Sequence, residues 1–538
     1  MTRHNLVFEK WLNSPVLNKE EKDQLFKYSP QEIEKYFHEK PFEFGTAGIR
    51  REVGIAPQKF NKYTYRVLAV GYAKYLKSKS LNPKAIVGHD NRINGDVYAM
   101  EIANVLRNFG IEVWIPPKNI HISTPILSYY IRKLGLTGGI NITASHNPPN
   151  YNGFKTYNNT GCQTNTEEER IIRIKTPHLS EIFDLNFEYF HDFKELPDSF
   201  VKDYFIDLIK TLPPIKQEDQ KFKVLFSSHH GTSSYNMSLL ASMMGFENFL
   251  EYSEECNVTW RLNEGEVSNP EEKESFNSSI KEAEKINAEY VFAHDPDGDR
   301  AAIAERQRDG SWYLFNGNEI GVLLSYFKCL YDRNLQKPYI VSTYVTGDFI
   351  QKIFPDIPIH TVLTGFKNIA GAVEEQQEKG NDLVVAYEEA IGALISPIHR
   401  EKDGYQQLAF ILKIISSIRP KNRRITDILD SLYKKYGYWK GFTEFYVFND
   451  LKETKKYFDS LNNVNFGDIC DYSLSKKEFN ENTKILSWYI KGGGWIKFRV
   501  SGTEPKFKVY YNIYGDSKEW IEEQANKLRF YFEKLFKI

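Results

Sequence analysis

The feature that most constrains the fold is an alternation of apolar, strand-like runs with helix-like segments, which recurs three times along the chain. The first block contains the runs AIVG (85–88), IEVWI (111–115) and GGINIT (138–143), with helix-like segments at 96–109 and 124–134. The alternation restarts at KVLFSS (223–228) and again at YIVSTY (339–344). Such alternation is typical of βαβ units, so we expect three α/β blocks, each built on a mostly parallel sheet.

The pattern changes after Pro420, where a Tyr- and Phe-rich stretch leads to the strand-like runs WIKFRVSG (495–502) and KVYYNIYG (508–515) and a helix from Ser517. These features predict a smaller α+β domain. A chain of 538 residues is long enough for roughly three to four domains. We therefore expect a helical N-terminal extension at 1–40, α/β domains at 41–215, 216–315 and 316–435, and an α+β domain at 436–538.

Charge and cysteine content exclude several classes of protein. The chain carries 70 basic and 71 acidic residues, so no overall field attracts it to nucleic acid or to an anionic membrane. Its four cysteines lie far apart without a CxxC pair, which favours reduced thiols over a disulfide framework or a zinc site. No signal-like apolar segment is present near the N-terminus, and a cytoplasmic enzyme is expected.

The segment HDPDGDR places Asp295, Asp297 and Asp299 two residues apart, directly after an apolar strand. Near-extended backbone would turn these three carboxylates to one side, where oxygen ligands select a hard cation such as Mg²⁺. An EF-hand is excluded because its glycine and glutamate positions fall on Arg300 and Arg306. A solvated acidic turn is the alternative, but three like charges on so short a loop repel one another, which favours metal binding.

The segment TASHNPPNYNGFK places Ser145 in a loop at the carboxyl end of a predicted strand, where α/β enzymes bind ligands. Ser145 is therefore a candidate nucleophile. The chain has neither a GxSxG elbow nor a GxxxxGK[ST] loop, which argues against an acyl hydrolase and a P-loop NTPase. By local chemistry alone, the Ser-His pair is more typical of a capped loop than of a catalytic dyad.

Three further segments are candidates for phosphate and hydroxyl binding. In RVSGTEPKFKVY, a guanidinium, two hydroxyls and a glycine could hold a phosphate, although a plain β-turn is an equal alternative; the residues are Arg499, Ser501, Gly502 and Thr503. AYEEAIG and HREKDG place Glu388, Glu389 and Lys402 near the end of the third block, where the alternative is a surface charge cluster.

Taken together and in this order, the motifs resemble those of the α-D-phosphohexomutase superfamily. FGTAGIR is similar to its N-terminal signature, TASHNPPNYNGFK to its phosphoserine loop and DPDGDR to its metal loop. TGFKN and YEEAIG are similar to its sugar-recognition loops, and RVSGTEPK to its phosphate loop. The matches span residues 44 to 508, and the resemblance implies four domains, three α/β and one smaller α+β, around a central cleft.

The resemblance also implies a role for each site residue. Ser145 would be the phosphoserine and would complete the shell of one Mg²⁺ with Asp295, Asp297 and Asp299. The reacting phosphoryl group would be near Arg50, Lys155 and Arg300, and Lys402 would serve as general acid and base if burial and neighbouring cations lower its pKa. The sugar hydroxyls would meet Thr364, Gly365 and Glu388, and the non-reacting phosphate would meet Arg499, Ser501, Gly502 and Thr503.

The implied activity is a mutase that interconverts sugar 1-phosphates with 6-phosphates (or 5-phosphates) through a bisphosphate intermediate, with a sugar bisphosphate as primer. A phosphoglucomutase or phosphomannomutase is the leading reading. Ala390 stands where hexose-specific members commonly have Ser, so a phosphopentomutase or a sugar-bisphosphate synthase is the alternative. A catalytically silent sugar-phosphate-binding protein is the alternative of another class. We expect a monomer or dimer without nucleic acid or membrane partners.

Overall fold

The computed structural model describes the chain except for residues 1–4, 258–266, 462–463, 465–467, 501–505 and 538. Three short helices open the described chain: α1 (Leu6–Leu12), α2 (Lys19–Leu25) and α3 (Pro30–Tyr36). Side chains of Asn18 and Ser29 cap α2 and α3, which satisfies backbone N–H groups that a helix start leaves free. Buried Trp11 contacts Tyr63 and Phe183 edge to face and so ties α1 to the first domain.

The first sheet has six strands in the order β1-β5-β4-β2-β3-β6. Its strands are β1 (Ile49–Glu52), β2 (Lys84–His89), β3 (Glu112–Ile115), β4 (Gly138–Ile142), β5 (Tyr151–Asn158) and β6 (Lys194–Glu195). Its helices are α4 (Lys62–Lys79), α5 (Gly95–Asn108), α6 (Thr124–Lys133) and α7 (Thr166–Lys175). The strands β4, β2, β3 and β6 are parallel, whereas β5 and β1 are antiparallel to their neighbours.

The second and third sheets repeat this plan and share one hydrophobic core. The second sheet, β11-β10-β9-β7-β8, contains β7 (Val224–Ser227), β8 (Phe249–Glu251), β9 (Tyr290–His294), β10 (Ala301–Arg306) and β11 (Trp312–Leu314). The third, β13-β12-β14-β15, contains β12 (Pro338–Thr343), β13 (Ile359–Val362), β14 (Asp382–Tyr387) and β15 (Ala393–Leu394). Their helices are α8 (Phe200–Thr211), α9 (Asn236–Met243), α10 (Asn277–Lys285), α11 (Gly317–Tyr331), α12 (Phe349–Ile353), α13 (Phe366–Glu378), α14 (Gly404–Ile418) and α15 (Ile425–Tyr436).

Most strands in each of the three sheets are parallel, as expected, but each sheet also contains at least one antiparallel strand. The chain leaves β4 and β9 through short loops rather than through crossover helices, so β5 and β10 return antiparallel beside them. Each of these two hairpin loops lies at the carboxyl end of a strand that also has a parallel neighbour. These are the loops in which the sequence placed Ser145 and the three aspartates.

The last domain is an antiparallel sheet of six strands in the order β16-β21-β20-β19-β18-β17. Its strands are β16 (Tyr438–Val447), β17 (Asp468–Ile469), β18 (Tyr472–Asn480), β19 (Ile485–Ile490), β20 (Trp495–Val500) and β21 (Lys506–Gly515), and its helices are α16 (Leu451–Leu461) and α17 (Lys518–Phe536). It has a core of its own that includes Trp488, Phe498 and Phe532. The predicted helix from Ser517 is confirmed, since Ser517 caps α17.

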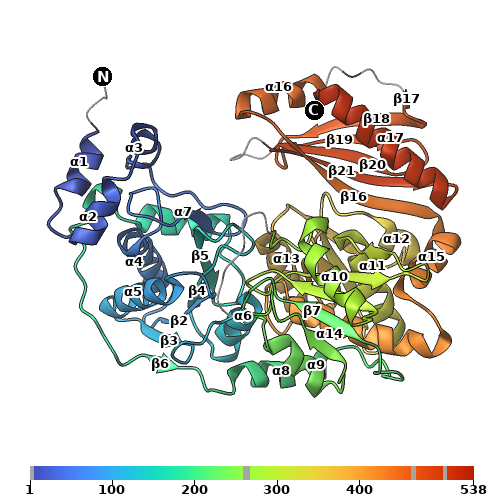
Figure 1. Ribbon diagram of the computed structural model, residues 1–538, viewed down its shortest axis with the longest axis horizontal. Helices are drawn as coiled ribbons and strands as arrows, with labels where there is room; N and C mark the ends of the chain where they lie inside the picture. Colours follow the sequence, from blue (N-terminus) through green and yellow to red (C-terminus); the bar gives the residue numbers. More distant parts are fainter. Residues whose placement is uncertain (1–4, 258–266, 462–463, 465–467, 501–505, 538) are drawn as a thin grey trace.

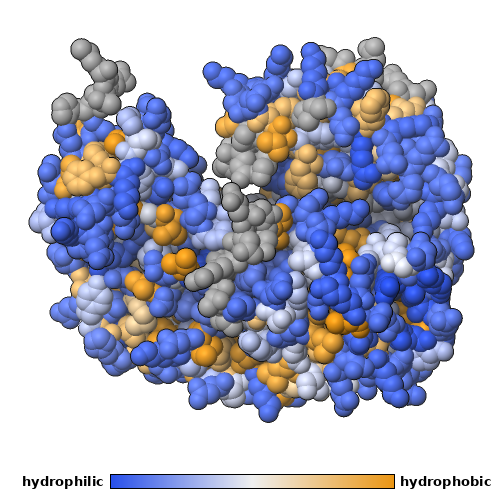
Figure 2. Space-filling view, viewed as in Figure 1, coloured by the Kyte–Doolittle hydropathy of each residue, from blue (hydrophilic) through white to orange (hydrophobic). Residues whose placement is uncertain are grey.

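The molecule has two lobes (Figure 1). Its four sheets belong to three α/β domains and one strand-rich domain, which confirms the predicted fold class. The first sheet and α1–α3 form one lobe, and the second and third sheets lie beside it with the last domain above them. The space-filling view shows a notch between the N-terminal helices and the last domain (Figure 2). Within the described chain, no helix combines the length and apolar character needed to cross a membrane.

Candidate active site

Ser145 lies in the loop between β4 and β5 and is almost fully buried, with 1 % of its surface exposed. Its φ is +51°, a left-handed conformation that is uncommon for a residue other than glycine and that marks strain at functional sites. The backbone is held in this conformation from both sides: its N–H donates to Thr143 Oγ1 at 2.9 Å, and its carbonyl accepts from Arg92 Nη2 at 2.6 Å. The fold thus fixes the direction of this serine.

The three aspartates belong to the hairpin loop between β9 and β10, which is a tight turn. The expectation of near-extended backbone is therefore wrong. Gly298, at φ +72°, donates its N–H to the Asp295 carbonyl, and Asp295 Oδ1 accepts the N–H groups of Asp299 and Arg300 at 3.1 and 3.0 Å. The turn still brings the carboxylates together, since one oxygen from each of Asp295, Asp297 and Asp299 lies within 4.8 Å of the others.

This carboxylate group fits a metal ion. All three aspartates are buried, and the Oδ1 atoms of Asp297 and Asp299 have no hydrogen-bond partner among the described residues. Asp295 Oδ2 accepts the hydroxyl of Ser145 at 2.7 Å. Burial raises the pKa of Asp295 well above its usual range, and the charges of Asp299 and Asp297 add to the rise. Buried, orphaned carboxylate oxygens beside a serine hydroxyl are the donor set that a hard divalent cation takes.

Two buried lysines from other parts of the chain reach the same carboxylates. Lys155, on β5, donates to Asp297 Oδ2 at 2.5 Å and to Asp299 Oδ2 at 3.2 Å. Lys402, just before α14, donates to Asp299 Oδ2 at 2.7 Å and lies 3.6 Å from Glu401 Oε1. Loops of all three α/β sheets therefore meet at one cluster of opposite charges.

The electrostatics of Lys402 differ from the expectation. Burial acts to lower its pKa, but the carboxylates of Asp299 and Glu401 outweigh burial and raise the pKa of Lys402 above its usual range. Burial acts to raise the pKa of Asp299, but the ammonium groups of Lys402 and Lys155 outweigh burial and hold that pKa well below its usual range. The expectation of a lowered lysine pKa rested on burial and neighbouring cations and left out the anions that contact the ammonium group.

Arg50 and Arg300 lie on either side of the Ser145 loop. Arg50, on β1, donates to Asn147 Oδ1 at 2.6 Å, and Arg300 Nη1 lies 3.2 Å from His146 Nδ1 and 3.7 Å from Glu271 Oε2. Burial, then Arg300 and Arg50, lowers the pKa of His146 well below its usual range, so its imidazole is neutral. Two guanidinium groups thus face the loop that carries the candidate nucleophile.

The predicted sugar loops lie side by side in the third domain. The N–H of Gly365 donates to Glu388 Oε1 at 3.1 Å, and Gly365 adopts φ +103° before the first turn of α13. A Cβ at Gly365 would lie 3.2 Å from Thr46 Cγ2, so the FGTAGIR segment of the first domain packs against this loop beside Thr364. Burial raises the pKa of Glu388 to about 7, although Lys402 opposes the shift. Glu388 is therefore a carboxylate that titrates near neutral pH.

Arg499 lies on β20 of the last domain, and burial raises the pKa of Tyr510 on β21 although the nearby charge of Arg499 opposes the shift. The charges of Glu389 and Glu271 also reach Tyr510, so this side of the last domain faces the second and third. The other predicted members of the phosphate loop, Ser501, Gly502 and Thr503, lie outside the described residues.

Sequence reasoning missed Arg92, which organises the whole Ser145 loop. Its guanidinium donates to four backbone carbonyls, those of Ser145, Asn147, Pro148 and Tyr151. A signal was present, because Arg92 follows the strand AIVGH in the segment HDNR, at the same edge of the sheet as the Ser145 loop. Thr124 was also missed; its hydroxyl donates to Asp297 Oδ2 at 2.8 Å.

Three models of one family match the chain in consecutive order. They are described as phosphoglucomutase/phosphomannomutase alpha/beta/alpha domains I, II and III, and they match residues 41–181, 202–310 and 316–436. Together they cover more than half of the chain.

Characterised relatives match over nearly the full length. The chain is 34% identical to a phosphomannomutase of Mycoplasmoides pirum, over 98% of both chains, and 30% identical to a phosphoglucomutase of Staphylococcus haemolyticus, over 90% of this chain and 94% of the relative. Among solved structures, parafusin, a phosphoglucomutase from Paramecium in its open form, has a TM-score of 0.66 at 19% identity, over 93% of this chain and 96% of its own. A phosphoglucomutase/phosphomannomutase family protein from Burkholderia thailandensis has a TM-score of 0.65 at 16% identity, over 91% and 97% of the two chains.

Proposed function

Because the chain belongs to the phosphoglucomutase/phosphomannomutase family and is a phosphosugar mutase, we propose that Ser145 is the residue that carries the phosphoryl group. One observation carries this assignment: the buried Ser145 hydroxyl lies 2.7 Å from Asp295, inside a cluster of carboxylates and lysines that three domains build together. A phosphoryl group on this oxygen would lie close to the ammonium groups that could balance its negative charge. The domain boundaries near residues 215, 315 and 435 are part of the same proposal.

We assign the cation site to one Mg²⁺, held by Asp295, Asp297, Asp299 and the phosphorylated Ser145. Carboxylate and phosphate oxygens without nitrogen or sulfur ligands favour Mg²⁺ over zinc. When bound, the ion would neutralise charge on the transferring phosphoryl group. The proposal draws on the orphaned Oδ1 atoms of Asp297 and Asp299.

The proposed reaction is two phosphoryl transfers in opposite directions. A free hydroxyl oxygen of the bound monophosphate forms a bond to phosphorus as the bond from phosphorus to Ser145 Oγ breaks, which gives a sugar bisphosphate. After the bisphosphate reorients, its other phosphoryl group returns to Ser145, and the isomeric monophosphate leaves. A sugar bisphosphate supplied from outside phosphorylates Ser145 by the same second step, so it acts as primer.

The chain's own residues supply position and positive charge, which account for most of the rate in phosphoryl transfer. Lys155, Arg50 and Arg300 lie close enough to the Ser145 loop to stabilise charge on the phosphoryl oxygens. Lys402 is the proposed group that exchanges a proton with the sugar hydroxyl; a cation bound at Asp299 would offset the carboxylate charge that raises the pKa of Lys402. Burial of Ser145 excludes water, which would otherwise hydrolyse the phosphoserine.

Substrate recognition is assigned to Thr364, Gly365 and Glu388 for the sugar hydroxyls, and to Arg499 with Ser501, Gly502 and Thr503 for the phosphate that does not react. The relatives named above favour hexose phosphates, of glucose or mannose. Ala390 favours a second candidate, a pentose phosphate, since no hydroxyl stands at this position of the sugar loop.

The two candidates are separated by a coupled assay of turnover with the 1-phosphates of glucose, mannose, ribose and deoxyribose, in the presence of Mg²⁺ and a bisphosphate primer. We expect the highest kcat/KM with glucose or mannose 1-phosphate. A higher kcat/KM with a pentose phosphate would establish the second candidate, and no isomerisation of any of the four would contradict both.

Replacing Ser145 by Ala tests the phosphoryl carrier. We expect this variant to lose turnover while it still binds a sugar phosphate, because Arg499 and the third-domain loops are unchanged. A catalytically silent binding protein would show no turnover in the wild type either. Unchanged turnover in the variant would refute Ser145 as the carrier.

A further inference from the structure

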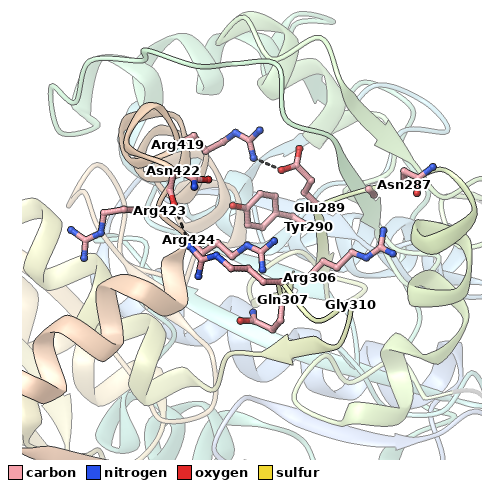
Figure 3. Close-up of a pocket in the computed structure, with 12 residues that line it drawn as sticks. Asn287, Glu289, Tyr290, Arg306, Gln307, Gly310, Arg419, Asn422, Arg423 and Arg424 are labelled. Carbon is pink, nitrogen blue, oxygen red and sulfur yellow. Dashed lines mark hydrogen bonds and ion pairs between the residues drawn. The ribbon is translucent and has the colours of Figure 1, made fainter.

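A second cavity rich in arginine lies at the end of the second sheet that is remote from the aspartate loop. It encloses about 440 Å³, a volume in the range of small-molecule sites. Its lining includes the five arginines Arg306, Arg308, Arg419, Arg423 and Arg424, together with the single acidic residue Glu289. Figure 3 shows Arg419 on one side of Tyr290, Arg306 and Arg424 on the other side, and Arg423 pointing away.

The cavity lies at one end of each of three elements. β9 begins there at Tyr290, β10 ends there at Arg306, and α14 ends one residue before Arg419. The opposite ends of the same elements lead to Asp295, Arg300 and Lys402 of the candidate active site. Six strand residues or fifteen helical residues separate the two ends, which corresponds to roughly 20 Å, so the cavity is a separate site.

Part of the positive charge is already neutralised by carboxylates in the cavity wall and behind it. Arg419 pairs with Glu289 and, at 2.9 Å, with Asp219. Arg308 makes a two-pronged contact with Asp427, with both N···O distances at 2.8 Å. These pairs hold Arg308 and Arg419 in the wall, so the charge of the other three arginines is not balanced by them.

Three of the arginines have no carboxylate partner in the part of the chain that the structure describes. Among the described residues, no carboxylate oxygen lies within 4.0 Å of the guanidinium nitrogens of Arg306, Arg423 or Arg424. Arg423 donates to the hydroxyl of Ser431 and to the Asp427 carbonyl, both uncharged. Nη1 of Arg424 is buried and has no hydrogen-bond partner within the described ranges, which is costly for a charged group unless a ligand completes it.

The backbone N–H groups at the start of α15 are not available to bind an anion in this cavity, because carboxylates of the chain already accept their hydrogen bonds. Glu305 accepts the N–H groups of Ile425 and Thr426 at 2.8 and 3.1 Å, and Asp427 accepts that of Arg424 at 2.9 Å. The capacity for an anion therefore comes from the guanidinium groups. Such groups match phosphate oxygens in pairs, which an ammonium group does not do.

We propose that this cavity binds a small metabolite carrying two or more phosphate groups, with Arg306 and Arg424 as the principal ligands. At least two negative charges are needed to balance these two guanidinium groups, and the enclosed volume admits a di- or triphosphate but no folded partner. The proposal is independent of the reaction assigned to Ser145, since it concerns binding at another place.

The test is hydrogen–deuterium exchange of the full chain with and without inorganic tripolyphosphate, in magnesium-free buffer. We expect slower exchange in the segments 287–290, 306–310 and 419–424. Protection confined to the loops around Ser145, Asp295 and Arg499 would overturn the proposal. This result needs no variant, so it stands even where a substitution impairs folding.

Calorimetric titration of the double variant R306A/R424A supplies a second test. We expect at least tenfold weaker tripolyphosphate binding at this site and loss of the protection, with an unfolding temperature close to that of the wild type. R333A, at an exposed arginine outside the cavity, is the matched control and should bind as the wild type does. Equal binding by all three proteins would overturn the assignment.

The source of the phosphates is then identified by competition. A nucleoside triphosphate and a hexose bisphosphate are each added to the complex with tripolyphosphate, and protection of the three segments is followed. Displacement by one of them at these segments identifies the class of metabolite. Failure of both to displace the probe would overturn the assignment to a phosphorylated metabolite.

Discussion

At the scale of single residues, the site is a buried group of charges in which some carboxylates are paired with lysines and others are not. Asp299 contacts two ammonium groups, those of Lys155 and Lys402, whereas within the described chain the Asp295 carboxylate accepts hydrogen bonds from Ser145 and two backbone N–H groups. Removing a charge therefore has unequal consequences at these two positions. Both aspartates are nonetheless assigned to the same cation.

Asp299→Asn and Asp295→Asn form a matched pair that tests this inequality in the metal-free protein. Asp299→Asn leaves two buried lysines without their shared carboxylate, and we expect a loss of about 3 kcal/mol in the free energy of unfolding. Asp295→Asn keeps an oxygen for the backbone N–H groups and removes a repelling charge, so we expect a change within about 1 kcal/mol. Chemical denaturation of both variants measures the difference, and both should lose turnover. Equal destabilisation of the two would contradict the assigned contacts.

Glu388→Gln tests the carboxyl whose pKa burial raises to about 7, with Lys402, Glu389 and Arg300 as the neighbouring charges. Because the folded pKa lies above the unfolded value, the folded state binds more protons, and this stabilisation is lost as the pH rises through 7. Glutamine stays neutral at every pH. We therefore expect the variant to be more stable than the wild type at pH 8, by up to about 3 kcal/mol, and nearly equal at pH 5. Unfolding temperatures at both pH values measure this, and a gap that does not change with pH would contradict it.

At the scale of elements, two hairpin loops carry the residues of the proposed chemistry, each at the carboxyl end of a strand with a parallel neighbour. The β4–β5 loop holds Ser145, and the β9–β10 loop holds the aspartates. Arg92 comes from the next strand of the first sheet and fixes the β4–β5 loop through four carbonyls. Geometry at Ser145 thus depends on a residue that lies outside both hairpin loops.

Arg92→Lys tests this positioning role. A lysine cannot donate to four carbonyls in a fixed fork, so the loop loses its support while the positive charge stays. We expect kcat to fall by about 10- to 100-fold with a smaller change in KM, and faster hydrogen exchange over residues 143–151. Arg173→Lys, at an exposed arginine on α7, is the control and should change neither quantity. Unchanged exchange in the loop of Arg92→Lys would contradict the role.

Many of the strands were predictable from the sequence. The runs AIVG, GGINIT and YVFAH are strands as predicted, because apolar runs between glycines and polar turns leave few other choices. The return of β5 and β10 as antiparallel strands was not predicted, since it depends on loop length and pairing rather than on the pattern within each strand. The turn at Asp295–Asp299 was missed for the same reason, although Pro296 and Gly298 are turn residues.

The candidate site was predictable residue by residue but not in its contacts. Motif order identified Ser145, Asp295 and Lys402, and all three are now found in one cluster. The pKa of Lys402 was expected to fall and instead rises, because its distance to Asp299 is a tertiary property with no trace in either segment. Arg92 was missed because its role lies in carbonyl contacts, which leave no charge pattern in the sequence.

At the scale of the whole molecule, four domains are arranged so that loops distant in sequence share one site. The Ser145 hydroxyl of the first domain contacts Asp295 of the second, and Lys402 of the third contacts Asp299. Gly365 of the third domain packs beside Thr46 of the first, so these two domains are also in contact. A phosphoryl group on Ser145 would therefore be surrounded by residues of three domains.

The central claim is that Ser145 carries the phosphoryl group, and intact-mass measurement tests it most directly. The wild type and Ser145→Ala are incubated with a hexose bisphosphate and Mg²⁺, and their masses and peptides are compared before and after. We predict one added phosphoryl group on the wild type, located on the peptide that contains Ser145, and none on the variant. A phosphoryl group on another peptide, or turnover in a protein that acquires none, would contradict the claim.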